Sequence, residues 1–168
     1  LPYPGGPVGP PGVLHVERKR FLCDERLYER ISCVNYSRDV VLLPLSLEFG
    51  ADFRDMFEVR GMRRSVRGMT HPPEINGRSV RFCYDGLDKV ERASVVSFSD
   101  PPGRMSGRRA DFMYSLQPEG RLELYIEVGA HSSAVPSRER FRGAAARARW
   151  DMRTRRRHGA RIKSSGGV

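Results

Sequence analysis

The sequence lacks the features that define several large classes of protein. No run of apolar residues approaches the roughly 20 that a membrane-spanning helix requires, and no charged and then apolar leader opens the chain. We therefore expect no membrane partner. The chain begins with Leu1 rather than Met, and we expect it to be a piece of a longer protein.

Cysteine is scarce, and its spacing argues against a zinc site. Cys23, Cys33 and Cys83 include no C-x-x-C pair and have no histidine at zinc-ligand spacing. This pattern favours three buried thiols in a reducing compartment, which predicts a cytoplasmic protein. The triplet N-Y-S at Asn35 is a formal glycosylation acceptor, but no other feature indicates secretion.

The short motifs of common enzymes are also absent. The chain contains no P-loop, no dinucleotide-binding G-x-G-x-x-G, no H-E-x-x-H and no G-x-S-x-G. We therefore predict no metal and no cofactor in this chain, and the candidates for chemistry that remain are a cluster of acids and a basic C-terminal segment.

Positive charge is abundant, but it is confined to the C-terminal segment. The formal net charge of the whole chain is +10. Residues 138–163 contain eleven Arg or Lys and two acids, a balance of 11 − 2 = +9, so the remainder of the chain carries only +1. A basic stripe across the whole fold, which is typical of a dedicated nucleic-acid surface, is therefore missing.

Alternation of apolar and polar residues with a period of two predicts strands along most of the chain. The segments with this pattern follow one another with short polar breaks and no intervening helix, which favours an antiparallel β-sandwich over a βαβ fold. The predicted strands are 13–22, 27–36, 40–50, 72–86, 89–99, 110–117 and 121–129.

Three of these segments allow more detailed predictions. In 27–36, the side with Leu27, Ile31 and Cys33 is expected to face the core. Segment 40–50 is apolar at nearly every position, as in a strand buried on both faces, although Pro44 implies a bulge or an edge. In 121–129 one face is apolar and the other polar, which predicts one face in water.

A hairpin is expected at Asn76–Gly77, because both residues tolerate positive φ. A helix is expected over 137–162, which is rich in Ala and Arg, with Ser137 as its N-cap and Gly159 as its stop.

The predicted helix carries one narrow apolar stripe and a separate tryptophan. The stripe consists of Phe141, Ala145, Ala148 and Met152. Trp150 lies about half a turn away from Phe141. We interpret this arrangement as a helix that is contacted from two sides.

Three segments follow from this pattern. Residues 1–12 contain nine Pro or Gly and form a loop or linker. Residues 13–136 form the β-sandwich domain. Residues 137–168 form a basic linker helix and the start of a connection to a further domain.

The stretch "ADFRDMFEVRGMRR", residues 51–64, contains the best candidates for chemistry. Asp52, Asp55 and Glu58 recur every three residues and are followed by arginines at 60, 63 and 64. Two carboxylates can act as a general acid and base in glycoside hydrolysis. A short helical crossover pinned by surface ion pairs is the favoured interpretation, because this spacing gathers the acids beside their natural partners.

The chain from "GVLHVERKRFL" through "ADFRDMFEVRG" resembles the N-terminal domain of the bacterial-type glycogen debranching enzyme (amylo-α-1,6-glucosidase) family. The later "LDKVERAS", "DPP" and basic helix occur in the same order, so that the resemblance covers about residues 12–160. "DFRDMFEVRG" is its most specific part.

The resemblance implies a supersandwich-like antiparallel β-sandwich, here truncated, that precedes an (α/α) toroid. The toroid carries the hydrolytic carboxylates that act on α-1,6-glucosidic branches and would begin after Ser165. This chain is then a non-catalytic domain that packs against the toroid and meets α-glucan only through the parent enzyme. The candidates for the interdomain surface or substrate groove are Asp52, Asp55, Glu58, Arg60, Arg63 and Trp150.

Two alternatives remain open. One is a basic nucleic-acid-binding fragment that acts through residues 138–163. Its weakness is that no aromatic platform accompanies the basic helix, so that a solvated helix face is favoured and nucleic acid is not the expected partner. The other is a stand-alone α-glucan-binding module.

Overall fold

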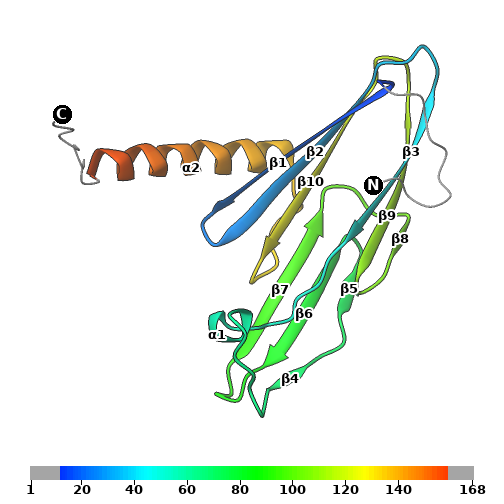
Figure 1. Ribbon diagram of the computed structural model, residues 1–168. Coiled ribbons are helices and arrows are strands. Elements are labelled where there is room, and N and C mark those ends of the chain that lie inside the picture. Colours follow the sequence, from blue (N-terminus) through cyan, green and yellow to red (C-terminus); the bar gives the residue numbers. More distant parts are fainter. Residues whose placement is uncertain (1–11, 159–168) are drawn as a thin grey trace, which may run out of the picture.

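Two antiparallel sheets and a C-terminal helix make up the fold (Figure 1). The computed structural model describes residues 12–158, with side chains up to residue 155. The strands are β1 (Leu14–Cys23), β2 (Arg26–Asn35), β3 (Val41–Glu48), β4 (Met69–Thr70), β5 (Glu74–Asn76), β6 (Ser79–Asp85), β7 (Glu91–Phe98), β8 (Arg104–Met105), β9 (Arg109–Leu116) and β10 (Arg121–Gly129). The helices are α1 (Met56–Val59) and α2 (Arg138–His158). The predicted antiparallel β fold with a terminal helix is confirmed.

The larger sheet has seven strands in the order β1-β2-β10-β7-β6-β4, with β5 paired to β6. The smaller sheet has the order β3-β9-β8. Every strand pair in both sheets is antiparallel. Neither helix in the described part of the chain combines the length and the apolar character that a bilayer span requires.

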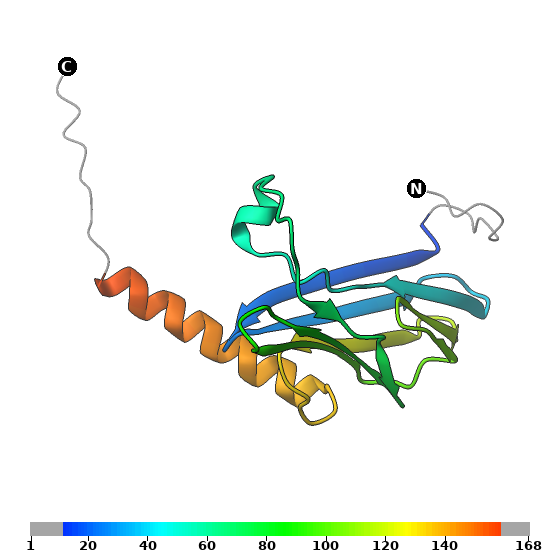
Figure 2. The same ribbon diagram turned by 90° about the horizontal axis from the view of Figure 1, so that it is seen from below.

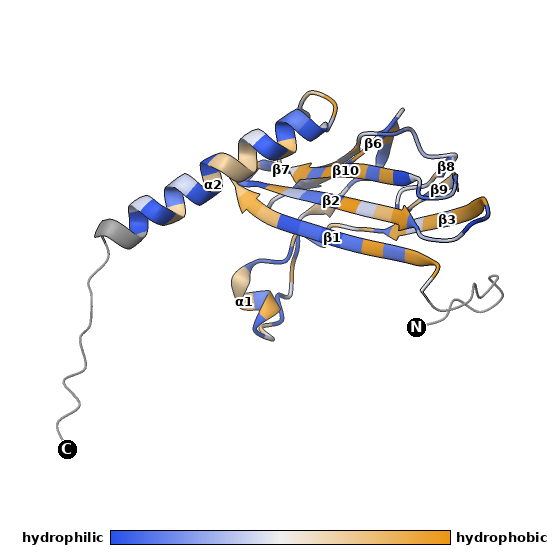
Figure 3. Ribbon diagram, turned by 90° about the horizontal axis from the view of Figure 1, so that it is seen from above, coloured by the Kyte–Doolittle hydropathy of each residue, from blue (hydrophilic) through white to orange (hydrophobic). Residues whose placement is uncertain are grey.

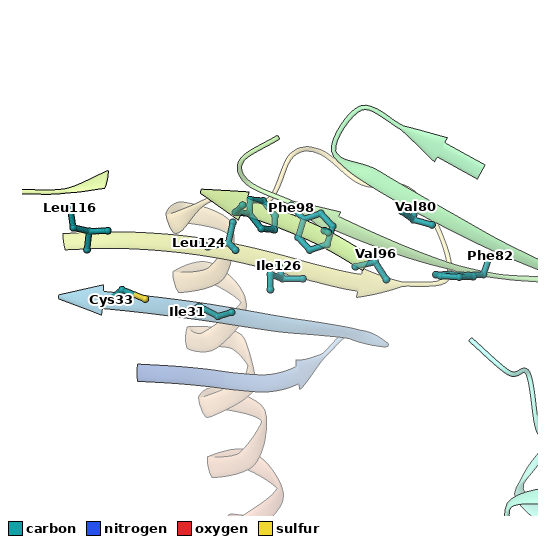
Figure 4. Packing of buried hydrophobic residues seen from close by; sticks show 11 residues of the cluster. Ile31, Cys33, Val80, Phe82, Val96, Phe98, Leu116, Leu124 and Ile126 are labelled. Atoms are coloured by element: carbon teal, nitrogen blue, oxygen red, sulfur yellow. The ribbon is translucent and has the colours of Figure 1, made fainter. Parts of the chain in front are cut away.

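The core lies between the two sheets and consists of apolar side chains from both (Figure 4). Phe98 of β7 and Leu124 of β10 are fully buried, and the rings of Phe98 and Phe112 meet at 5.4 Å between centroids. Ile31 and Cys33 of β2 belong to the same cluster, which confirms the predicted inner side of that strand.

The face of β10 that was expected to lie in water does so only at its start, where Arg121 is exposed. Tyr125 and Glu127, on the side away from the core, are buried. The reason is that α2 packs on the outer face of the larger sheet, where a small cluster joins Cys23, Tyr28 and Ala144. Alternation therefore identified the inner face of β10 but not the cover on its outer face.

The prediction that β3 is buried on both faces is wrong. Leu43 and Leu45 pack on the core, whereas Leu42 on the other side is 68% exposed. Within the described chain β3 pairs only with β9, in an uninterrupted register from Val41 opposite Leu116 to Glu48 opposite Arg109. Pro44 therefore marks an edge strand rather than a bulge, since an edge position needs fewer backbone donors.

Two tight hairpins shape the larger sheet. The predicted hairpin between β5 and β6 forms, but its turn lies one residue later, because Gly77 has φ of +55° and Asn76 is still paired with Ser79. The β1–β2 hairpin turns on Asp24 and Glu25, with φ of +49° and +57°. Two successive residues of positive φ match the twist of antiparallel strands. The turn contains no glycine, so that the sequence provides no clear signal for it.

Asn35 at the end of β2 fastens the two sheets together. Its side chain is fully buried, and its amide nitrogen donates hydrogen bonds to the carbonyl oxygens of Asp39, Leu116 and Gln117 at 2.8, 3.1 and 3.1 Å. Its carbonyl oxygen accepts from the backbone of Ser37 at 2.9 Å. The N-Y-S triplet therefore serves the interior of the fold and presents no acceptor for a glycan.

Helix α2 begins as predicted, but a different stripe of residues packs on the sheet. Ser137 Oγ accepts a hydrogen bond from the Arg140 backbone at 3.3 Å, the geometry of an N-cap. Ala144, rather than Ala145, is fully buried beside Phe141 and Ala148, while Met152 is 58% exposed. The helix crosses the sheet and then extends past it (Figures 1 and 3), so that its far half has no sheet beneath it. The predicted stop at Gly159 lies outside the described residues.

Candidate functional site

The segment around α1 is ordered by a capping box. Asp55 Oδ1 accepts hydrogen bonds from the backbone nitrogens of Phe57 and Glu58, both at 2.9 Å. Glu58 Oε2 in return accepts from the backbone nitrogen of Asp55 at 3.1 Å. The spacing D-x-x-E in the sequence thus satisfies the orphan amides at the start of the helix.

Each of the three acids in this segment has an arginine partner, but of the three arginines named from the sequence only Arg64 forms such a pair. Asp55 binds Arg64, Glu58 lies 3.1 Å from Arg67, and Asp52 lies 3.6 Å from Arg54. Among the described residues, Arg60 and Arg63 form no ion pair, and both are exposed.

These contacts argue against a general acid at this site. The hydrogen bond from the Glu58 backbone, followed by the Arg64 guanidinium, lowers the pKa of the Asp55 carboxyl below its ordinary value. A catalytic proton donor needs its pKa raised, as happens in an apolar pocket. The contacts of Asp55 therefore stabilise the conformation of the loop and do not prepare a proton donor.

The same segment is tied to the larger sheet through Tyr84 of β6. The ring of Phe53 stacks on the ring of Tyr84, with centroids 5.5 Å apart. The Cζ atom of Arg67 lies over the same Tyr84 ring, 5.8 Å from its centroid. Tyr84 Oη also accepts a hydrogen bond from the Gly68 backbone at 2.8 Å. Both ends of the α1 segment are thus attached to one side chain of the sheet.

The apolar side chains of this segment point away from the domain. Helix α1 buries none of its residues, and it projects from the sheets (Figure 2). Five apolar side chains in the segment are between 48% and 72% exposed. We call these residues the α1 apolar face: Met56, Phe57, Val59, Met62 and Val66.

Two hollows border the α1 segment. One, of about 260 Å³, lies between the segment and the β6–β7 turn and is lined by Phe53, Asp55 and Asp88 among others. The other, of about 650 Å³, lies at the mouth between the two sheets, with Phe49 and Phe82 among its apolar lining. Both are open at the surface, so that they add concave area beside the α1 apolar face.

Trp150, the remaining candidate from the sequence, lies on α2 and is 66% exposed. Figures 1 and 3 show α1 and the far half of α2 as two separate projections. The structure therefore brings the acids and arginines of residues 52–67 together but does not bring Trp150 to them.

The near half of α2 is anchored by a buried carboxylate that the sequence pattern did not reveal. Glu127 is 2% exposed and accepts two hydrogen bonds from Arg140, both at 2.7 Å, and one from Ser133 at 3.1 Å. Phe141 packs against Phe21 and Tyr125, with ring centroids at 5.1 and 5.7 Å. The signal in the sequence that could have revealed this contact was an acidic residue in β10 followed by an arginine-rich helix.

At the β1–β2 turn, Cys23, Asp24 and Asp151 present three potential metal ligands within 4.8 Å of one another. Arg147 already lies 3.2 Å from the Asp24 carboxylate. Burial raises the pKa of the Cys23 thiol, with the neighbouring Asp24 acting in the same direction. A cation would therefore have to displace a guanidinium and deprotonate a protected thiol, and we assign no metal here.

Comparison with known proteins supports the resemblance seen in the sequence. Residues 2–127 match the model of a family described as the N-terminal domain of some glycogen debranching enzymes. The match ends before α2. No curated protein matches the chain.

One solved structure shows a similar fold at low identity, and a second is similar to a smaller degree. A putative kojibiose phosphorylase from the human microbiome superposes with a TM-score of 0.50 at 12% identity, over 83% of this chain and 19% of that one. A polysaccharide lyase gives a TM-score of 0.44 at 17% identity, over 77% of this chain and 22% of that one. The chain thus spans about a fifth of the length of either protein. Because the matched family model covers most of its residues, the chain belongs to the family of N-terminal domains of glycogen debranching enzymes.

Proposed function

We propose that this chain is a non-catalytic β-sandwich domain that supports the catalytic domain of a glycogen-debranching glycoside hydrolase. The partner is an (α/α) toroid of the same protein that hydrolyses α-1,6-glucosidic branches. The α1 apolar face is the observation that carries the proposal, because an ordered segment with five large apolar side chains exposed to solvent is typical of a docking surface.

The polar framework of the segment supports a preformed rather than an induced surface. The capping box and the Asp55–Arg64 and Glu58–Arg67 pairs hold the backbone in one conformation before any partner arrives. Less conformational entropy is then lost on docking, which strengthens association. In this proposal Asp52, Asp55 and Glu58 shape the surface.

Arg60 and Arg63 provide the charged rim of the proposed surface, since both are exposed and form no ion pair within the described residues. A polar rim around an apolar centre is the usual anatomy of an interface. Trp150 provides a second contact, made by the far half of α2.

The same proposal covers the substrate and the compartment. The chain meets α-glucan only as part of the parent enzyme, and its three cysteines, all buried and unpaired, fit the reducing cytoplasm. No specific observation favours the nucleic-acid alternative, and Arg140 and Arg147 of α2 are already engaged by Glu127 and Asp24.

The experiment compares two substitutions in the protein that contains both domains. Val59→Asp introduces a charge into the α1 apolar face, and Met113→Asp introduces the same charge at an equally exposed residue on the outer face of β9. We expect Val59→Asp to reduce the rate of debranching of a limit dextrin and to make the two domains easier to separate by limited proteolysis. Met113→Asp is expected to change neither the rate nor the proteolysis. Equal behaviour of the two variants would contradict the docking role.

The chain by itself tests the non-catalytic assignment. Incubated with a limit dextrin, it is expected to release no glucose above the buffer blank. Release of glucose that scales with the amount of chain and survives repeated purification would show that the domain is itself an enzyme.

A further inference from the structure

Strand β1 has a long free edge. Along its whole length it pairs with β2 on one side, from Leu14 opposite Asn35 to Cys23 opposite Arg26, and within residues 12–158 it pairs with no other strand. Antiparallel pairs alternate between residues that exchange hydrogen bonds and residues that do not. The bond from the Tyr36 nitrogen to the Val13 carbonyl, at 2.8 Å, sets the odd-numbered residues toward β2.

The even-numbered residues of β1 therefore turn their N–H and C=O groups to the free edge. Their side chains lie on the same side of the larger sheet as Ile31, which faces Arg18 in the register. These residues are Leu14, Val16, Arg18, Arg20 and Leu22.

The smaller sheet does not cover this part of the inner face. Val16 is 50% exposed and Leu22 is 73% exposed, although they stand on the side of the sheet that is apolar elsewhere. Arg18 lies over the buried Glu29, with 2.5 Å between Nε and Oε1. The free edge thus borders an open strip with two apolar positions and two arginines between them.

The other sheet edges are shorter or guarded. Strands β4 and β8 have two residues each, and β3 carries Pro44, which limits backbone pairing. Strand β1 has ten residues and no proline. It is protected from pairing by charge alone, since Arg18, Lys19 and Arg20 follow one another at its centre. Arg18 and Lys19 are paired with Glu29 and Glu17 at 2.5 and 2.8 Å, so that Arg20 is the one of these three that forms no ion pair within residues 12–158.

This charge opposes pairing with a second copy. If two β1 strands paired antiparallel about Arg18, the Arg18 side chains would face each other, and if they paired about Lys19, Arg18 would face Arg20 of the other copy. Like charges directly opposite one another destabilise a strand pair. A strand with carboxylates at those positions would reverse the sign of the same interaction.

We propose that the β1 edge binds an extended acidic polypeptide segment as an additional strand. The backbone of the segment bonds to the free groups of the even-numbered residues, its carboxylates face Arg18 and Arg20, and its apolar side chains cover Val16 and Leu22. Binding by strand addition obtains affinity from the main chain and specificity from alternate side chains. This site is independent of the α1 apolar face and extends beyond the proposed function.

Synthetic peptides test the proposal with the chain as it stands. The probe is the nine-residue peptide Thr-Val-Thr-Glu-Thr-Glu-Thr-Val-Thr, in which one face carries two carboxylates between two apolar residues. The first control replaces both Glu by Lys. The second control keeps Glu but carries N-methyl groups on alternate amides, which removes strand pairing and leaves the charge intact.

We expect the acidic peptide to bind and to slow amide exchange at Val16, Arg18 and Arg20, and both controls to bind at least about tenfold more weakly. Val16→Pro removes an N–H that faces the free edge without removing a bond to β2, and it should abolish binding while thermal unfolding changes little. Should this variant fold poorly, Arg20→Glu serves instead, because it reverses an exposed charge of the strip.

Three results would overturn the proposal. If the N-methylated peptide bound as tightly as the acidic peptide, the contact would be charge attraction alone, without an added strand. Self-association of the chain that Val16→Pro abolishes would identify a second copy as the occupant. Absence of any binding by the acidic peptide would leave the β1 edge as a guarded edge only.

Discussion

The two helices of this domain use their apolar side chains in opposite ways. Helix α2 turns Phe141 and Ala144 onto the larger sheet and neutralises the buried Glu127 with Arg140. Helix α1 itself is held by its capping box and ion pairs, and it turns Phe57 and Val59 to solvent. The comparison teaches that α2 belongs to the core of its own domain over its near half, whereas the apolar side chains of α1 have no partner among residues 12–158.

The largest effect should come from removing the cation over Glu127. We expect Arg140→Met to lower the free energy of unfolding by about 3 kcal/mol, because it leaves a buried carboxylate with the hydrogen bond from Ser133 and with Arg26 at 3.8 Å as its nearest described cation. Urea denaturation measures the change. Arg142→Met, at an exposed position on the same helix, is the matched control and should have little effect. Adding Glu127→Gln to Arg140→Met should restore part of the loss, and equal losses for Arg140→Met and Arg142→Met would contradict the anchoring role.

A smaller effect is expected from the aromatic contact of the same helix. Phe141→Ala should lower the free energy of unfolding by about 2 kcal/mol, less than for a fully buried ring, because Phe141 is half-buried between Phe21 and Tyr125. Trp150→Ala, in the exposed far half, should change it by less than about 0.5 kcal/mol. A larger loss for Trp150→Ala than for Phe141→Ala would show that the far half is packed on the domain.

The ring beneath α2 should also make the domain sensitive to alkali. Burial, and then the hydrogen bond that Tyr125 Oη donates to Glu123 at 2.6 Å, raises the pKa of Tyr125 from 10.0 to about 12. A folded-state pKa above the unfolded one means that this stability is fully present below about pH 10 and is lost as the pH rises toward 12. Denaturation at pH 8 and pH 11 should show a smaller decline for Tyr125→Phe than for the natural chain. The same decline in both would exclude Tyr125 as the source.

The smallest effect is expected in α1. Val59→Asp in the chain by itself should change the free energy of unfolding by less than about 0.5 kcal/mol, because Val59 is 72% exposed and touches no core. The inward Leu43 of β3 is the contrasting position, and Leu43→Asp should destabilise strongly. Thermal unfolding of both variants measures the difference, and a loss above about 1 kcal/mol for Val59→Asp would place α1 in the core after all.

The sequence predicted those parts of the fold that follow from local pattern. Alternation located the long strands and the inner sides of β2 and β10, because one face of each strand meets the same apolar interior. It could not locate the outer cover. Glu127 has the polar pattern of a wet face, and only the docked helix makes it a buried anchor.

The candidate site was predicted in its elements but not in its pairing. The spacing of Asp52, Asp55 and Glu58 indicated a short helical crossover, and a short helix is present, with a capping box that was not predicted. The partner of Glu58 is Arg67, which the chain brings back after a loop, so that counting along one helix could not identify it. Likewise, Ala144 and Ala145 lie three and four residues after Phe141, and both positions fall near Phe141 around the helix axis, so that periodicity could not decide which of them meets the sheet.

Hydrogen exchange of the α1 segment tests the central claim most directly. The amides of Met56 to Met62 should be measured in the chain by itself and in a protein that also contains the proposed catalytic toroid. The docking account predicts slower exchange of these amides in the two-domain protein, while the core amides of β7 and β10 keep their rates. Identical exchange of the α1 segment in both would contradict it, because the α1 apolar face would then remain in water with its proposed partner present.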